Sequence, residues 1–264
     1  MDFETILYTI ENGVATITLN RPKKLNAFND QMAHETTKAL KGSARNPEVR
    51  AIMITGSGRG FSAGADLSSG DLKAENLATR RVGDHLKKVF HPIVIEMVSI
   101  EKPVITAVNG VAAGVGMSVA LSGDIRIAGD KSAFTLGFSK IGLVPDGGAN
   151  WLLTRMLGYA KAFEIAVTSE KISAEKALEL GLLNHVILQD ELMPFATAMA
   201  EKIAAGPTRA FGLTKRAMQA SLNQSYFENL EYEAHLQTIA GRTEDHLEGV
   251  TAFLEKRPSE FKGK

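Results

Sequence analysis

The stretch NGVAAGVG at residues 109–116 decides how this chain folds. It follows the apolar run PVITAV, whose length and β-branched residues are typical of a buried strand. Residues 110–123 are rich in glycine and alanine and are predicted to form a helix. A similar glycine-rich stretch, SAGAD at residues 62–66, follows the apolar run RAIMIT after a short loop. Repeated strand–turn–helix units of this kind predict an α/β fold.

Further elements extend this pattern toward the N-terminus. The dipeptide Asn12-Gly13 separates two β-rich runs and predicts a tight hairpin. A helix is expected over residues 29–44, because it has apolar residues on one side and a good N-cap at its start. A second helix is expected over residues 74–100, where Pro92 marks a kink or a restart.

The character of the chain changes toward the C-terminus. DIRIAG at residues 124–129 is expected to be a core strand, and a short strand followed by a loop is expected before Trp151. After Trp151 the segments show helical apolar periods or helix-boundary residues. The sequence therefore predicts an α/β core over residues 1–190 and a helical C-terminal region over residues 191–264.

The composition excludes several classes of site. The chain has 264 residues, of which 44% are hydrophobic, and it contains no cysteine. This length allows a core that needs no disulfide or metal for stability. Without cysteine there is no disulfide framework, thiolate zinc site or cysteine nucleophile. The six histidines show no ligand spacing such as HExxH, so we expect no metal site.

Charge and hydropathy limit the expected partners. Thirty basic side chains balance thirty acidic ones, which leaves no basic surface for nucleic acid. The longest apolar runs are shorter than the ~20 residues that a membrane span needs. The N-terminus lacks the basic region and apolar core of a secretory signal. We therefore expect a cytoplasmic enzyme or binding protein with no nucleic-acid and no membrane partner.

Short motifs suggest functions that their surroundings do not support. GFSAG at residues 60–64 matches the G-x-S-x-G of serine hydrolases, but the five loop residues GSGRG (56–60) lie between the preceding strand and Phe61, and no HGGG-type loop is present. GVG at residues 114–116 lacks the third glycine of a dinucleotide fingerprint. GSGRG at residues 56–60 lacks the Gly-Lys-Ser/Thr of a phosphate loop.

The two glycine-rich stretches offer another kind of site. Turns in front of helices present free backbone N–H groups, which attract negative charge. Two such groups that converge on one carbonyl oxygen would stabilise an enolate. The glycines could equally serve only to let helices pack closely on the sheet, and the pattern alone does not decide between these roles.

Together with NRPKKLNAF at residues 20–28 and IGLVPDGGA at residues 141–149, these stretches resemble the enoyl-CoA hydratase/isomerase (crotonase) superfamily. The likeness runs through the whole chain, with four motifs in the family's order. It implies a crotonase-like superhelix, a spiral of ββα turns, followed by a helical trimerisation region. It therefore implies a homotrimer, or a hexamer made of two trimers. It also implies an acyl-CoA substrate, with coenzyme A as part of the substrate and no separate cofactor.

The resemblance also implies roles for individual residues. The family's two oxyanion-hole N–H groups correspond to those of Ala65 and Val115. The implied contacts to coenzyme A and the acyl group are Lys24, Leu25, Ala27, Ala63, Asp66, Leu67, Gly114, Phe138 and Leu143. Asp66 has an alternative role as a helix cap. Lys256 and Phe261 are implied to reach coenzyme A, including that of a neighbouring subunit.

The chain departs from the family's hydratases at the two glutamates that add water. The matching positions hold Ser118 and Phe138, and neither side chain serves as an acid or a base at neutral pH. Asp146 is the one carboxylate left in this region, at a position where related isomerases and a chlorobenzoyl-CoA dehalogenase place an aspartate. Asp146 could instead be the N-cap of the helix through Trp151.

One carboxylate suffices for an isomerisation, in which Asp146 takes a proton beside the thioester and returns it to a distal carbon. We expect Phe138, Leu143 and Val144 to exclude water and so raise the basicity of Asp146. The enzyme would shift the double bond of an enoyl-CoA or open a ring epoxide. The alternatives are a hydratase, a dehalogenase with Asp146 as nucleophile, and a non-catalytic member that binds acyl-CoA or RNA.

Overall fold

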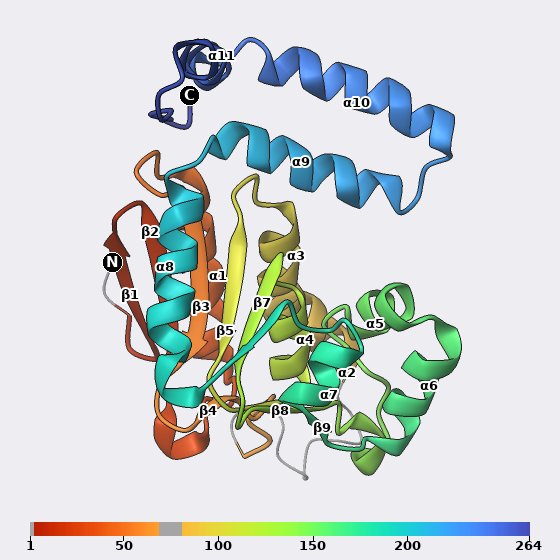
Figure 1. The fold of residues 1–264 in the computed structure, drawn as a ribbon. Coiled ribbons are helices and arrows are strands. Elements are labelled where there is room, and N and C mark those ends of the chain that lie inside the picture. Colours follow the sequence, from red (N-terminus) through yellow and green to blue (C-terminus); the bar gives the residue numbers. More distant parts are fainter. Residues whose placement is uncertain (1–2, 69–80) are drawn as a thin grey trace.

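The computed structural model describes residues 3–68 and 81–264 and contains two β-sheets surrounded by helices (Figure 1). The larger sheet has the strand order β1 (Ile6–Glu11), β2 (Val14–Leu19), β3 (Ala51–Gly56), β5 (Val104–Val108), β7 (Ile125–Gly129) and β10 (His185–Ile187). Its strands run parallel, except that β1 and β2 form an antiparallel hairpin. The predicted α/β class is confirmed.

A smaller sheet lies beside the end of the larger one. Its strand order is β4 (Gly60–Ser62), β6 (Val111–Ala113), β8 (Ala133–Thr135) and β9 (Ile172–Ser173). Successive strands of the chain alternate between the two sheets, because β4 follows β3, β6 follows β5 and β8 follows β7. Helices then lead to the next turn, so the chain forms the spiral of ββα turns that the resemblance implied.

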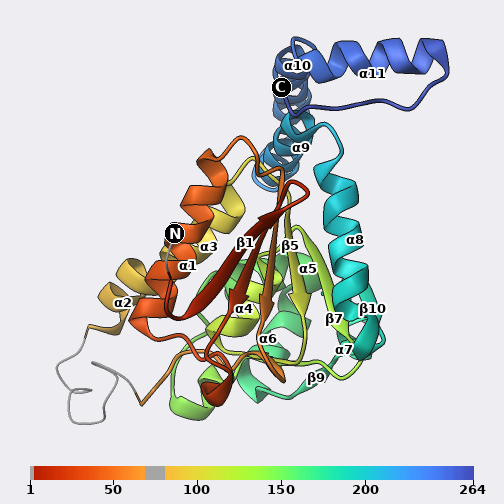
Figure 2. The ribbon, with the colours of Figure 1, turned by 90° about the vertical axis from the view of Figure 1, so that its left-hand side faces the viewer.

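Helices cover both faces of the larger sheet. The helices of the core are α1 (Asp30–Arg45), α2 (Val82–His85), α3 (His91–Ser99), α4 (Val115–Leu121), α5 (Ala149–Leu157), α6 (Tyr159–Thr168), α7 (Ala174–Glu179) and α8 (Leu192–Ala204). Figure 2 shows α1 and α3 on one face of the sheet and α8 on the other. The first face carries the larger apolar cluster, which includes the fully buried Phe28, Phe61 and Phe134.

The helices that lie outside the core come after α8 in the chain. Leu192, Ala196 and Ala200 of α8 are buried against the sheet, although they follow the predicted division at residue 190. Beyond one end of the sheet lie α9 (Thr208–Ser221), α10 (Tyr226–Ala240) and α11 (Glu244–Glu255) (Figures 1 and 2). Within the described part of the chain, no helix is both long enough and apolar enough to cross a membrane.

Several local predictions are confirmed. The turn between β1 and β2 places Asn12 and Gly13 at φ of 48° and 77°, as a tight hairpin requires. Helix α1 begins after Asn29, whose side chain accepts a hydrogen bond from the Met32 N–H at 3.0 Å. Pro92 lies in the first turn of α3, which restarts the helix after the π-helical turn Leu86–Phe90. The first part of the helix predicted over residues 74–100 lies outside the described residues.

One helix prediction is wrong at its start. Residues 110–123 do not form one helix, because Val111–Ala113 is strand β6, which pairs with β4 and β8. Gly114, with φ of +52°, then turns the chain into α4. The strands β4, β9 and β10 were not predicted either, since two or three residues are too short to show a period.

Candidate active site

The two glycine-rich stretches meet where β4 ends and α4 begins. A Cβ atom on Gly64 would lie 2.8 Å from the carbonyl oxygen of Ala113. A Cβ atom on Gly116 would lie 2.6 Å from the carbonyl oxygen of Ser62. No side chain fits at such distances, and Gly64 also has φ of +92°. The glycines therefore allow the close packing. Because Gly64 lies against Gly114, the packing places the segments that continue into Ala65 and Val115 side by side.

The N–H groups of Ala65 and Val115 both point away from the main-chain hydrogen bonds of their own segments. Phe28 pairs with the segment around Ala65 as in a parallel sheet: its N–H donates to Gly64, and its carbonyl accepts from Asp66. This pattern leaves the N–H of Ala65 on the other side of the segment. Val115 is the first residue of α4, so its N–H has no acceptor within the helix. The geometry thus supports the predicted pair of donors.

Asp146 lies beside the start of α4. The Ser118 hydroxyl donates a hydrogen bond to the Asp146 carbonyl oxygen at 2.8 Å. A Cβ atom on Gly147 would lie 2.8 Å from Ser118 Cβ and 3.4 Å from Val115 Cγ2. The loop that carries the carboxyl group is therefore packed against the helix whose first residue supplies a predicted N–H donor.

The Asp146 side chain is held in an environment that favours its neutral form. Its Oδ1 atom is buried, and no group of the described residues forms a hydrogen bond with it. Burial raises the pKa of Asp146 to about 6. The alternative role as a helix N-cap is not supported. The N-cap of α5 is Gly148, no side chain caps this helix, and the Ala149 N–H bonds to the main-chain carbonyl of Asp146.

The prediction of which residues exclude water from Asp146 is only partly correct. Phe138 is buried, and its Cζ would lie 3.9 Å from a Cβ atom on Gly114, so its ring lies beside the second donor turn. Leu143 and Val144 are 43% and 78% exposed, so the expectation that they exclude water from Asp146 is wrong for the single chain. They follow the 3₁₀ turn Phe138–Ile141 on the surface.

The two positions that hold glutamate in the family's hydratases carry no ionisable group. Ser118 is fully buried, and its hydroxyl is engaged with the Asp146 carbonyl oxygen. Phe138 is apolar and buried. Of the two carboxylates near the donor turns in the described chain, Asp66 is bound by Arg21, which leaves Asp146 as the candidate acid or base.

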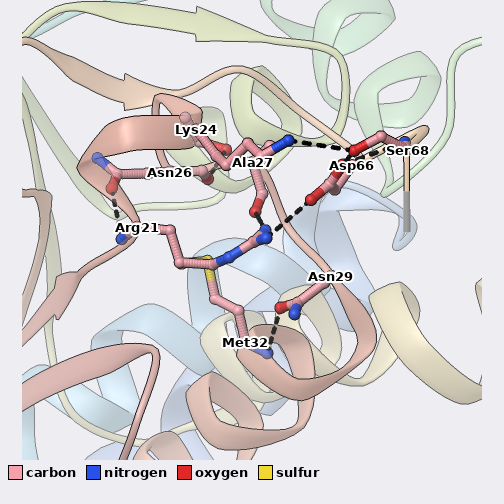
Figure 3. A network of polar contacts seen from close by, with 9 residues as sticks. Arg21, Lys24, Asn26, Ala27, Asn29, Met32, Asp66 and Ser68 are labelled. Carbon is pink, nitrogen blue, oxygen red and sulfur yellow. Dashed lines mark hydrogen bonds and ion pairs between the residues drawn. The ribbon is translucent and has the colours of Figure 1, made fainter. Parts of the chain in front are cut away.

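Several predicted coenzyme A contacts lie on the other side of Ala65, near the turn Pro22–Lys24, and Figure 3 shows three of them: Lys24, Ala27 and Asp66. The Ala63 N–H donates to the Leu25 carbonyl oxygen at 2.9 Å, and Lys24 Nζ lies 3.4 Å from Ser68 Oγ. The predicted residues in this group are Lys24, Leu25, Ala27, Ala63, Asp66 and Leu67. Their contact with coenzyme A stays a prediction.

Sequence reasoning missed two residues that organise this group. Arg21 forms an ion pair with Asp66, with 2.8 Å between Nη2 and Oδ2 (Figure 3). Asn26 is fully buried, and its side-chain amide donates to the carbonyl oxygens of Ser57 and Gly60. An asparagine between apolar neighbours was the available signal for Asn26. Arg21 gave no signal, because its partner lies 45 residues away.

The structure gives no catalytic role at this site to Ser62 or Phe261 of the same chain. Ser62 of the G-x-S-x-G match is fully buried and donates to the Asn26 carbonyl oxygen, so it is no exposed nucleophile. The Phe261 carbonyl oxygen accepts from Arg50 at the start of β3, about 20 Å along that strand from the end that leads to β4. Phe261 of the same chain is thus remote from Ala65. Among the described residues, no group of three histidine, aspartate or glutamate side chains could hold a metal ion.

Comparison with known proteins adds an independent finding. A family model described as enoyl-CoA hydratase/isomerase matches residues 9–264. The chain is 41% identical to the 1,2-epoxyphenylacetyl-CoA isomerase of Escherichia coli strain K12, over 99% of both chains. It is 42% identical to a probable enoyl-CoA hydratase of Rhodobacter capsulatus over the full length of both. Its fold matches a putative enoyl-CoA hydratase/isomerase from Mycobacterium abscessus with a TM-score of 0.92, at 32% identity over 98% of this chain and 100% of that one.

Proposed function

Because this chain belongs to the enoyl-CoA hydratase/isomerase family, we propose that it isomerises acyl-CoA thioesters with one carboxylate, that of Asp146. The family makes the protein an enzyme that acts on enoyl-CoA-type thioesters. The observation that carries the choice of isomerase is the buried Oδ1 of Asp146, which lacks a partner among the described residues. The two hydratase glutamate positions hold the buried, non-ionisable Ser118 and Phe138.

The proposed reaction starts with polarisation of the thioester. The carbonyl oxygen accepts hydrogen bonds from the N–H groups of Ala65 and Val115, and each such donor contributes about 3 kcal/mol to stabilising the enolate. The carboxylate of Asp146 removes a proton from the carbon beside the thioester, and the electron pair moves into the enolate. The same carboxyl group then returns the proton to a distal carbon, and the double bond shifts.

The pKa of Asp146 suits this role. Burial raises the pKa to about 6, so the group is a stronger base than an ordinary aspartate and is still largely ionised at neutral pH. A hydration needs one group to activate water and a second to protonate the neighbouring carbon. Ser118 and Phe138 supply neither, which favours isomerisation over hydration.

A panel of three thioesters tests the proposal: a trans-2-enoyl-CoA, a cis-3-enoyl-CoA and a ring epoxide of an arylacetyl-CoA. We expect an isomerised product of unchanged mass from at least one of them. Asp146→Asn should lower that rate at least about 100-fold while thioester binding persists. The control Asp190→Asn makes the same chemical change at an exposed site and should leave the rate unchanged.

The other outcomes separate the alternatives. A product heavier by one water, formed as fast as the isomer, would replace the proposal by a hydratase. An aryl ester trapped on Asp146 would identify a dehalogenase. Binding of all three esters without turnover would indicate a non-catalytic member.

We also propose that the chain assembles as a homotrimer, alone or as a pair of trimers. The helices beyond the core carry large apolar side chains that are at least 70% exposed in the single chain: Tyr226, Phe227, Leu247, Phe253 and Leu254. Apolar surface of this extent marks an interface. Sedimentation should give a multiple of three chains, and Phe253→Asp should weaken the assembly. A monomeric wild type at micromolar concentration would refute this proposal.

A further inference from the structure

The position of the Ala65 N–H depends on a neighbouring turn of the chain. The Phe28 N–H donates to the Gly64 carbonyl oxygen at 2.7 Å, and the Asp66 N–H donates to the Phe28 carbonyl oxygen at 2.8 Å. Ala65 lies between these two bonds, so the residues around Phe28 fix the direction in which its N–H points. Any movement of that turn therefore moves the donor.

The turn itself needs support from outside. Leu25 and Asn26 both have left-handed backbone conformations, with φ of 48° and 55°, which L-residues adopt at a cost of about 1 kcal/mol or more each. The guanidinium group of Arg21 spans the turn: Nη1 donates to the Ala27 carbonyl oxygen, and Nη2 donates to Asp66 Oδ2 (Figure 3). One side chain thus connects the residue before Phe28 with the residue after Ala65.

The Arg21–Asp66 pair is shielded from water. The side chains of Arg21 and Asp66 are 19% and 6% exposed. Burial opposes ionisation of Asp66, but hydrogen bonds from Ser68 and Arg21 outweigh it, and the pKa of Asp66 lies below its usual value. A shielded pair with several hydrogen bonds holds a defined geometry, unlike an exposed ion pair.

We propose that Arg21 and Asp66 are positioning residues for the oxyanion hole: their ion pair holds the Ala65 N–H in the direction from which it polarises the thioester carbonyl. This inference rests on the proposed function, because it assumes that Ala65 is one of the two donors. Neither side chain touches the reacting atoms. Since the donor acts most strongly on the charge of the transition state, its displacement lowers kcat more than it raises KM.

The test measures polarisation of a bound thioester directly. The probe is trans-cinnamoyl-CoA with an isotope-labelled carbonyl. The carbon beyond its double bond belongs to the aromatic ring and carries no proton, so an isomerase cannot shift the double bond. Binding to the wild type should lower the infrared stretching frequency of the carbonyl. We expect Arg21→Met to reduce this lowering to less than about half and to reduce kcat about 10- to 100-fold on the best isomerisation substrate, with KM changed less than about threefold.

A matched control removes a different shielded cation. Lys215 forms an ion pair of the same length, 2.8 Å, with Asp124, and its side chain is 9% exposed. It lies on α9, outside the candidate active site. Lys215→Met should lower stability but leave the carbonyl frequency at its wild-type value. If both substitutions change the frequency equally, the effect is general loosening and the inference is overturned.

Milder variants keep the test decisive if Arg21→Met does not fold. Arg21→Lys keeps the charge but cannot reach Ala27 and Asp66 with one planar group, and Asp66→Asn keeps the size but loses the ion pair. Both should give an intermediate carbonyl frequency, and a wild-type frequency in both would refute the inference.

A wild type that polarises the probe but isomerises no substrate would refute the proposed function alone. A wild type that does not polarise the probe would refute the oxyanion hole and the inference together.

Discussion

Replacing Asp146 by asparagine should stabilise the folded protein at neutral pH while it removes the proposed activity. The buried carboxyl group has its pKa raised from 3.8 to about 6. Its ionised form is therefore less favourable in the folded state than in the unfolded chain. Asparagine has nearly the same shape and carries no charge, so Asp146→Asn removes the ionisation cost. The same burial that raises the basicity of Asp146 lowers the stability of the folded protein at neutral pH.

The magnitude follows from linkage between protonation and folding. Because the folded-state pKa lies above the unfolded-state value, the folded protein binds more protons between pH 3.8 and about 6. The contribution that protonation of Asp146 makes to the free energy of unfolding is fully present below pH 3.8 and is lost as pH rises through about 6. Each pH unit between the two pKa values corresponds to about 1.4 kcal/mol, which sets a limit of about 3 kcal/mol. Since the group is partly exposed, screening by water reduces the expected cost to about 1–2 kcal/mol.

Urea unfolding at fixed protein concentration measures this cost. We expect the difference in unfolding free energy between Asp146→Asn and the wild type to grow by up to about 1 kcal/mol from pH 4.5 to pH 8, because part of the cost already arises below pH 4.5. Asp190→Asn, at an exposed position, should show no such growth. A pH-independent difference for Asp146→Asn would show that the carboxyl group is not strained by burial, and the argument for its raised basicity would fail.

Three further predictions concern the same site. The isomerisation rate should rise about tenfold per pH unit below about 6 and level off above it, because the base must be ionised; a rate that falls with pH would instead make Asp146 an acid. Ser118→Ala removes the hydrogen bond to the Asp146 carbonyl oxygen, worth about 1 kcal/mol, and should lower kcat about 3- to 10-fold at unchanged KM in steady-state assays. Ser118→Glu should not produce hydratase activity, as measured by absorbance with a trans-2-enoyl-CoA, because the main chain at Gly147 already occupies the adjacent space.

The fold was largely predictable because its main signals are local. The Asn12-Gly13 turn, the cap at Asn29 and the buried run at β3 each depend on residues close together in the chain, and each is found in the structure. The division of residues 110–123 into β6 and α4 was not predictable in this way. It depends on pairing with β4 and β8, which come from distant parts of the sequence.

The support of the site was harder to predict than its chemical groups. Asp146 stood out because it is the one carboxylate in its segment, and two glycine-rich turns indicated the donors. The interactions of Arg21 and Ser118 gave no signal, because their partners lie 45 and 28 residues away along the chain. Polar groups that act through long-range contacts cannot be identified by period or by turn chemistry, which are both local properties.

Two local features of this chain support the proposed isomerisation over hydration. Ser118 binds the main chain at Asp146, and Gly147 lies so close that a Cβ atom there would be 2.8 Å from Ser118 Cβ. The backbone of the aspartate loop thus fills the space beside the first hydratase glutamate position, and the Phe138 side chain fills the second. Neither position then holds a second ionisable group. A group that accepts and returns the same proton needs no second acid or base, whereas the addition of water does.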